Sequence, residues 1–211
     1  QGTPILSEIE FAGRYTDARM ICITGSNGKT TTTSLIYHIL KKAGVDVGLA
    51  GNIGHSLALQ VAQAPHSTYV IELSSFQLDN MYKFHANIAV LLNITPDHLD
   101  RYGFKMQNYV DSKMRILQNQ TSADTFVYWK EDEHVPTELP RYNTPSQVCG
   151  FTDEEQANSS GYATADTFVV NSPVHFEMPL SELSLPGRHN LRNSLAAAIA
   201  CLAAGVDAAV V

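Results

Sequence analysis

The first 120 residues alternate short apolar runs with segments of helical periodicity. Four apolar runs have the length of buried strands, at residues 20–24, 47–50, 69–73 and 88–94. Helices are expected over residues 30–43, 56–62 and 107–119, because apolar side chains recur there on one face. Strands that alternate with helices predict right-handed crossovers and a mainly parallel sheet with helices on both faces.

The pattern changes from residue 125 to residue 186. Short alternating segments such as 167–171 and 174–178 are interrupted there by prolines and by turns rich in Asn and Ser. These segments predict a few short strands that form a small antiparallel β annex on the main sheet. Residues 190–204 then read as an Ala-rich helix that Gly205 ends. The whole chain, residues 1–211, is therefore expected to form one domain.

Composition narrows the classes of function. The 211 residues are 44% hydrophobic, and 14 Lys and Arg stand against 21 Asp and Glu, a formal charge of −7. This balance argues against nucleic-acid binding, which needs a clustered basic surface. The three cysteines (Cys22, Cys149 and Cys201) have neither disulfide-framework nor zinc-site spacing. No signal peptide begins the chain and no apolar run has membrane-spanning length, so a cytoplasmic protein without membrane contact is expected.

The strongest motif lies between the first predicted strand and the helix that follows it. Its residues 25–31 are Gly25, Ser26, Asn27, Gly28, Lys29, Thr30 and Thr31. Main-chain N–H groups of such a turn, together with the helix N-terminus, form a nest for phosphates. Lys29 is expected on the outer phosphates and the Thr30 hydroxyl on Mg²⁺. The spacing is shorter than in the standard phosphate loop, and the alternative is an ordinary turn. With strand, loop and helix in order, we expect a P-loop-type α/β fold.

Each of the four strands is followed by polar residues able to do chemistry. The loop of Lys29, then Asn52, Glu72 and the segment before His98 come after successive strands. Ligands of open parallel sheets bind outside the carboxyl ends of the strands, so these residues are expected on one rim. Taken singly, each is equally compatible with a structural role in a turn or loop. Beside a phosphate loop, Glu72 is a candidate Mg²⁺ ligand.

Two further positions stay open on spacing alone. Lys113 lies beside the apolar stripe of the 107–119 helix, where a lysine more often extends along the core to solvent than does chemistry. Asn190 and Asn193 lie three residues apart at the start of the last helix. Either can be an N-cap, or the two amides together can bind a base or a ribose.

Six motifs then stand in the order in which Mur ligases carry them: ITGSNGKTTTT, GLAGNIG, ELSSFQLD, LLNITPDHLDRYG, DSKMRI and LPGRHNLRNSLAA. The chain resembles the central ATP-binding domain of this family from residue 8 to residue 211. ELSSFQLD is similar to the branch that adds D-glutamate to UDP-N-acetylmuramoyl-L-alanine in peptidoglycan synthesis. The resemblance implies a single central domain, without the N-terminal uridine-nucleotide domain and the C-terminal amino-acid domain of those ligases.

The resemblance also implies roles for individual residues. It makes Lys29, Glu72, His98 and Lys113 catalytic, with Lys113 carried as a carbamate. Two Mg²⁺ ions are implied, one on Thr30 and Glu72 and the other on His98 and carbamylated Lys113. Asn52, His98 and, more weakly, Ser74 are implied as substrate contacts, and Asn190 and Asn193 as contacts of the adenine side of ATP.

The implied reaction is an ATP-driven amide ligation through an acyl phosphate. Its substrates are ATP, UDP-N-acetylmuramoyl-L-alanine and D-glutamate. The alternatives are another Mur-type or folylpolyglutamate ligase, a phosphotransferase acting on a small hydroxyl acceptor, and a nucleotide-binding module without turnover. A phosphotransferase leaves Lys113 unexplained, and the last alternative is expected if the flanking domains are required for ligation.

Overall fold

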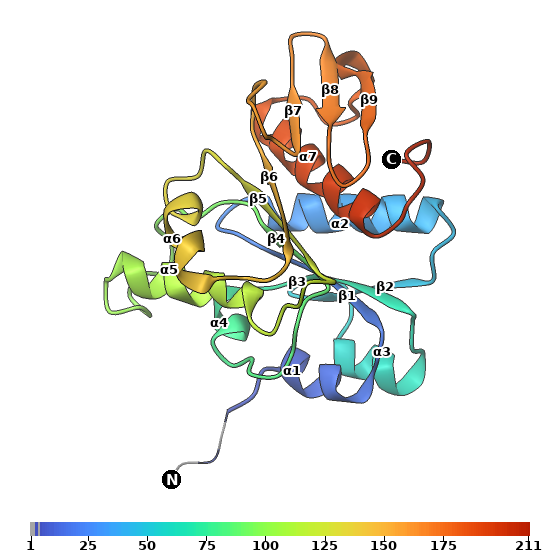
Figure 1. The fold of residues 1–211 in the computed structure, drawn as a ribbon. Helices are drawn as coiled ribbons and strands as arrows, with labels where there is room; N and C mark the ends of the chain where they lie inside the picture. Colours follow the sequence, from blue (N-terminus) through green and yellow to red (C-terminus); the bar gives the residue numbers. More distant parts are fainter. Residues whose placement is uncertain (1–2, 4) are drawn as a thin grey trace.

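The computed structural model describes residue 3 and residues 5–211, and its centre is one nine-stranded sheet (Figure 1). The spatial order is β2-β3-β1-β4-β5-β6-β7-β8-β9, and every pair from β2 to β7 is parallel. The strands are β1 (Arg19–Thr24), β2 (Val47–Gly51), β3 (Thr68–Glu72), β4 (Ile88–Leu91), β5 (Thr125–Trp129), β6 (Gln147–Phe151), β7 (Gly161–Ala163), β8 (Thr167–Val170) and β9 (Phe176–Pro179).

Helices cover both faces of this sheet, as the alternation of strands and helices predicts. One face packs against α2 (Lys29–Lys42) and α7 (Arg188–Ala203). The other face packs against the shorter helices α1 (Glu8–Ala12), α3 (Leu57–Gln63), α4 (Ser75–Leu78), α5 (Met106–Met114) and α6 (Val135–Tyr142). The strands between these layers are buried on both sides, which is why they read as continuous apolar runs in the sequence.

The predicted elements of the first half are confirmed, with small changes at their ends. The four predicted strands are β1 to β4, and the predicted helices are α2, α3 and α5. Ser56 caps α3, accepting a hydrogen bond from the Leu59 N–H. The helix expected to reach residue 119 ends at Met114 and continues only as a 3₁₀ turn, Arg115–Leu117. The short helix α1, capped by Ser7, was not predicted.

The prediction that the antiparallel annex begins at residue 125 is wrong, because it begins later in the chain. β5 and β6 are parallel strands of the main sheet with α6 between them, and antiparallel pairing is confined to β7–β8 and β8–β9. Two prolines, Pro136 and Pro140, stand inside the sequence of α6 and conceal its helical pattern. The annex is also a continuation of the main sheet, since β7 pairs with β6.

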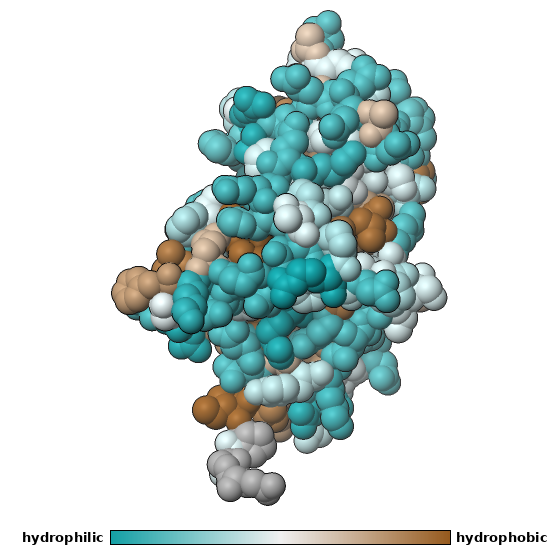
Figure 2. Space-filling model, turned by 60° about the vertical axis from the view of Figure 1, so that its left-hand side comes forward, coloured by the Kyte–Doolittle hydropathy of each residue, from teal (hydrophilic) through white to brown (hydrophobic). Residues whose placement is uncertain are grey.

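The surface and the helices give no sign of a bilayer-spanning element among the described residues. None of the described helices is long and apolar enough to cross a membrane. The face in Figure 2 is largely hydrophilic, with apolar patches separated from one another.

Candidate functional site

The turn between β1 and α2 has the backbone of an anion site. Gly25 and Gly28 have φ values of 152° and 85°, a region that residues with a Cβ rarely adopt. Gly28 is the N-cap of α2, and no side chain caps the first N–H groups of the helix. Those N–H groups and the positive end of the helix dipole are therefore available to a phosphate.

The end of β4 holds the turn in place. The main-chain N–H of Ser26 donates to the Asn93 carbonyl at 2.9 Å, and the N–H of Asn27 donates to Asn93 Oδ1 at 2.8 Å. Asn93 Nδ2 donates back to the carbonyl of Asn27 at 3.0 Å. The Ser26 hydroxyl lies 3.1 Å from the Tyr109 hydroxyl. Asn93 and Tyr109 are absent from the predicted site residues, although the position of Asn93 just after a strand was a signal.

Two lysines donate to the same carbonyl of this turn. Lys29 Nζ lies 3.0 Å from the Gly25 oxygen and Lys113 Nζ lies 2.8 Å from it. Lys113 is only 2% exposed, so its ammonium does not extend to solvent as most lysines beside an apolar stripe do. Burial, reinforced by the charge of Lys29 and opposed by Asp97, lowers the pKa of Lys113 to about 7. At neutral pH a large fraction of its amine is uncharged.

Glu72 joins residues that follow three different strands. Its carboxylate is 1% exposed and accepts hydrogen bonds from Thr30 Oγ1 at 2.9 Å and from Asn52 Nδ2 at 3.0 Å. Glycine is required at position 51, because a Cβ there would collide with the main-chain carbonyl of Glu72. A hydroxyl and a carboxylate are hard oxygen donors, the chemistry that Mg²⁺ prefers. The Thr30–Glu72 pair therefore fits one magnesium ion.

Among the described residues, His98 and Ser74 form no hydrogen bond with Thr30, Asn52 or Glu72. The His98 ring lies 3.6 Å from Asp97 and stacks obliquely on Phe76, and its side chain is 58% exposed. Within the described residues His98 forms no hydrogen bond or ion pair with Lys113 or Glu72, and its role as a ligand of a second Mg²⁺ stays a prediction. Ser74 is the N-cap of α4 and forms a capping box with Gln77. No group of three or more His, Cys, Asp or Glu able to hold a metal occurs in the described part of the chain.

Helix α7 brings its two asparagines to the phosphate loop. Gly187, not an asparagine, is the N-cap, so the N-cap interpretation of Asn190 and Asn193 is wrong. Asn193 is 7% exposed, and a Cβ on Gly28 would collide with its Oδ1. Asn193 Nδ2 lies 3.4 Å from Asn190 Oδ1, and Asn190 Nδ2 donates to the Pro186 carbonyl.

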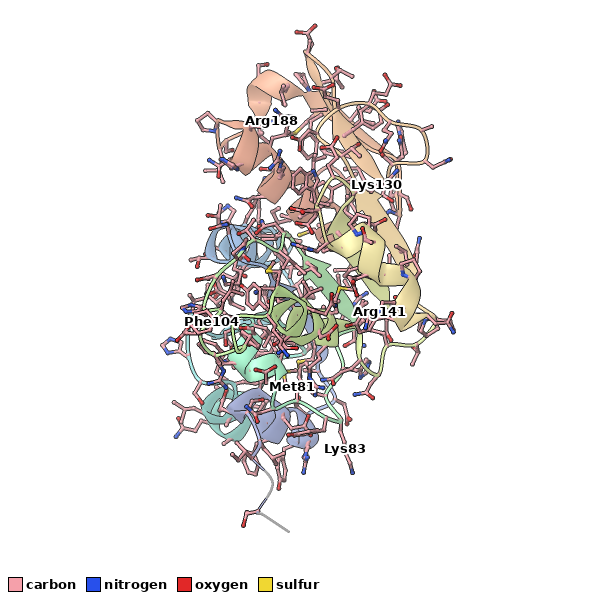
Figure 3. All side chains as sticks on the ribbon, turned by 90° about the vertical axis from the view of Figure 1, so that its left-hand side faces the viewer. Met81, Lys83, Phe104, Lys130, Arg141 and Arg188 are labelled. Atoms are coloured by element: carbon pink, nitrogen blue, oxygen red, sulfur yellow. The ribbon has the colours of Figure 1, made fainter. Side chains whose placement is uncertain are left out.

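A cleft of about 240 Å³ opens between the phosphate loop and the start of α7. It is lined by Asn27, Gly28, Thr31, Leu92, Asn93, His189, Arg192 and Asn193. Figure 3 shows where this helix begins, at the labelled Arg188. The loop at one end of the cleft fits phosphates, and the amide of Asn193 at its other wall fits the polar edge of a base or the hydroxyls of a ribose.

Comparison with known families agrees with this geometry. The model of the Mur ligase middle domain matches residues 23–201. The chain therefore belongs to the Mur ligase middle-domain family.

Individual relatives narrow the branch of the family. The chain is 61% identical over 206 residues to the UDP-N-acetylmuramoylalanine–D-glutamate ligase of Bacteroides fragilis, a match covering 98% of this chain and 46% of that protein. It is 54% identical over 202 residues to the ligase of the same name from Porphyromonas gingivalis, covering 94% and 45%. The chain thus spans about half the length of the curated relatives that it matches.

Solved structures share the fold at lower identity. A UDP-N-acetylmuramoyl-L-alanyl-D-glutamate–2,6-diaminopimelate ligase superposes with a TM-score of 0.74 at 24% identity, covering 96% of this chain and 46% of that one. MurF ligase from Thermotoga maritima, solved in complex with ADP, superposes with a TM-score of 0.69 at 22% identity, covering 96% and 50%.

Proposed function

We propose that this chain is the ATP-binding part of a ligase that joins D-glutamate to UDP-N-acetylmuramoyl-L-alanine. The observation that carries the proposal is the open N-terminus of α2 in the Gly25–Thr31 loop, next to the hydrogen bond from Thr30 to the buried Glu72 carboxylate. The names of the relatives at 54–61% identity support the choice of substrates. In this proposal the reaction belongs to peptidoglycan precursor synthesis in the cytoplasm, and parts of a longer protein bind the uridine nucleotide and D-glutamate.

The chemical problem is that a carboxylate is a poor electrophile. The γ-phosphoryl group of ATP is transferred to an oxygen of the alanine carboxylate, which gives an acyl phosphate and ADP. The amine of D-glutamate then forms a bond to the acyl carbon, loses a proton, and phosphate leaves with the electrons of the carbon–oxygen bond. The approach of carboxylate and phosphate brings like charges together. Lys29 and the N–H groups of the loop offset that repulsion.

One Mg²⁺ would be held by Thr30 and Glu72. Bound there, the ion supplies positive charge that stabilises the transferring phosphoryl group. Asn52 keeps the carboxylate of Glu72 aligned, because it donates to the oxygen that Thr30 does not reach.

Lys113 fits the chemistry of carbamylation, although its metal role stays a prediction. A lysine adds CO₂ only as a neutral amine, and burial with a pKa of about 7 keeps much of this amine neutral. The role of His98 as a ligand of a second Mg²⁺ also stays a prediction, and in this structure its ring contacts Asp97 and Phe76.

Nucleotide binding by this chain tests the core of the proposal. Titration calorimetry with ADP and Mg²⁺ should give a saturable heat that Lys29→Ala weakens tenfold or more. Lys41→Ala is the matched control, since Lys41 is an exposed lysine on the same helix. Equal affinities of the two variants would overturn the phosphate-loop assignment. The ligation is tested in the full-length protein by detecting, with mass spectrometry, an amide product that depends on D-glutamate.

A further inference from the structure

Arg192 occupies a position in the nucleotide cleft that neither the motifs nor the comparisons assign. It lies on α7 between Asn190 and Asn193 and lines the cleft beside Gly28. Its guanidinium stacks on the ring of Trp129, with the guanidinium carbon 3.8 Å from the ring centroid. Trp129 itself is not among the residues that line the cleft. The arginine is thus a layer between the tryptophan and the cleft.

Asp153 fixes the plane of this guanidinium. Its carboxylate, whose side chain is 3% exposed, accepts from Arg192 Nε at 2.7 Å and from Arg192 Nη2 at 2.6 Å. Two parallel hydrogen bonds of this kind fix orientation as well as position. Burial by itself would raise the pKa of Asp153, but hydrogen bonds from Arg192 and Arg188 lower it overall. The carboxylate therefore stays charged at neutral pH and keeps the guanidinium in place.

The arrangement leaves one surface of the guanidinium uncommitted. Trp129 covers one face and Asp153 takes one edge, yet the side chain of Arg192 keeps 23% of its exposure and borders the cleft. A planar cation stacks well on an aromatic ring, and its two faces are chemically equivalent. Asn193, the next residue of the same helix, also lines the cleft, and its side-chain amide lies beside Gly28.

We propose that the planar base of the nucleotide stacks on the outer face of Arg192, so that the base, the guanidinium and Trp129 form three layers. Arg192 is then a specificity-determining residue, and Asp153 is a positioning residue that acts through it. The proposal rests on the proposed function in one respect, the binding of the phosphates by the Gly25–Thr31 loop. It adds what distinguishes a nucleoside phosphate from a bare polyphosphate.

The test compares two probes, ADP with Mg²⁺ and inorganic tripolyphosphate with Mg²⁺, which share phosphate chemistry but not the base. Arg192→Ala should lower the affinity for ADP about tenfold and leave that for tripolyphosphate within twofold. Arg192→Lys keeps the charge but lacks the planar face, and it should not restore ADP binding. Arg188→Ala is the matched control, because Arg188 pairs with the same carboxylate but does not line the cleft.

The possible results separate the competing explanations. If both arginine variants weaken both probes equally, the arginines only anchor α7 and the stacking proposal is wrong. If Arg192→Ala leaves the ratio of the two affinities unchanged, it is also wrong. If the unsubstituted chain binds tripolyphosphate as tightly as ADP, only the stacking proposal fails. If it binds neither probe, the phosphate loop assignment fails first and the stacking proposal with it.

A second measurement needs no variant. Trp129 is the single tryptophan of the chain, and Arg192 touches its ring. Seating a base on Arg192 should change the tryptophan emission, whereas tripolyphosphate should change it little. Identical responses to the two probes would contradict the three-layer arrangement.

Discussion

Two buried carboxylates, at two different regions of the molecule, are held in opposite ways. Glu10 on α1 is 0% exposed and accepts from the consecutive main-chain N–H groups of residues 82–84 and from Arg14. Glu72 at the rim of the sheet is 1% exposed and, within the described part of the chain, its carboxylate accepts only from the side chains of Thr30 and Asn52. The two carboxylates are buried to nearly the same extent, but they differ in the kind of group that donates hydrogen bonds to them.

The kind of donor separates a structural carboxylate from one that can exchange partners. Main-chain N–H groups cannot rotate away, so Glu10 is committed to the loop that follows α4. Side-chain hydroxyls and amides can turn to other partners, so Glu72 can give an oxygen to a cation at small cost. The contrast teaches that burial alone does not identify a functional charge, and that its donors must be examined.

The largest effect is expected at Glu72. Glu72→Gln removes the negative oxygen that faces Thr30, and Mg²⁺-dependent binding of ATP should weaken a hundredfold or more, about 3 kcal/mol. The unfolding midpoint should move little, because an amide oxygen still accepts one of the two hydrogen bonds. Calorimetric titration with and without EDTA measures the first quantity and thermal melting the second. Unaltered magnesium dependence in the variant would remove Glu72 from the site.

At Glu10 we expect the opposite result, a loss of stability without a loss of nucleotide binding. Glu10→Gln places an amide donor against main-chain donors, and the free energy of unfolding should fall by about 3 kcal/mol while nucleotide affinity is unchanged. Glu155→Gln, at an exposed glutamate, is the matched control and should change neither quantity. Urea denaturation measures the loss. If Glu10→Gln lost nucleotide binding while keeping its stability, the structural role given to Glu10 would be wrong.

The contribution of the Glu10 carboxylate to stability should decrease at acidic pH. Burial would raise its pKa, but the hydrogen bonds from residues 82–84 and Arg14 lower it below the ordinary value of 4.5. A carboxyl with a lowered folded-state pKa contributes stability above its unfolded pKa and loses it as the pH falls through the folded one. The stability difference between the unsubstituted chain and Glu10→Gln should therefore shrink below pH 4.5. A constant difference across that range would show that the charge of Glu10 is not what stabilises the loop.

The free energy of unfolding should depend on pH through Lys113. The folded chain releases this proton near pH 7, whereas the unfolded chain keeps it until about 10.5. Because the unfolded state binds more protons in that window, the free energy of unfolding should rise by about 2 kcal/mol between pH 7 and pH 9 relative to Lys113→Met. Denaturant titrations in metal-free and CO₂-free buffer measure the difference. Parallel curves for the two proteins would show that Lys113 titrates normally.

The smallest effect is expected at Ser74. Its side chain caps α4, so Ser74→Ala should lower the free energy of unfolding by about 1 kcal/mol. If capping is its whole role, the KM of the full-length protein for the muramoyl substrate should stay the same. A raised KM with unchanged stability would restore the substrate contact that the sequence suggested for Ser74.

The sequence predicted the first half of the fold because its strands are buried on both faces. Runs such as those of β1 and β3 then become continuous apolar segments, and the loop at Gly25–Thr31 carries its own backbone requirement for glycine. β5 and β6 were not recognised as parallel strands, since they depend on α7, a helix that is distant in sequence and covers them. The helix between them is concealed by its prolines.

For the site, the sequence determined which chemical groups meet at the rim, since parallel strands place their carboxyl ends on one edge whatever the details of packing. That rule predicted Lys29, Asn52, Glu72 and His98 at the rim, and the phosphate-loop motif added Thr30. Only the tertiary structure decided that Lys113 is buried against the Gly25 carbonyl and that Arg192 is fixed between Asp153 and Trp129. These depend on the packing of helices against loops far away in the chain, and the local pattern of residues carries no record of which distant group a long side chain will meet.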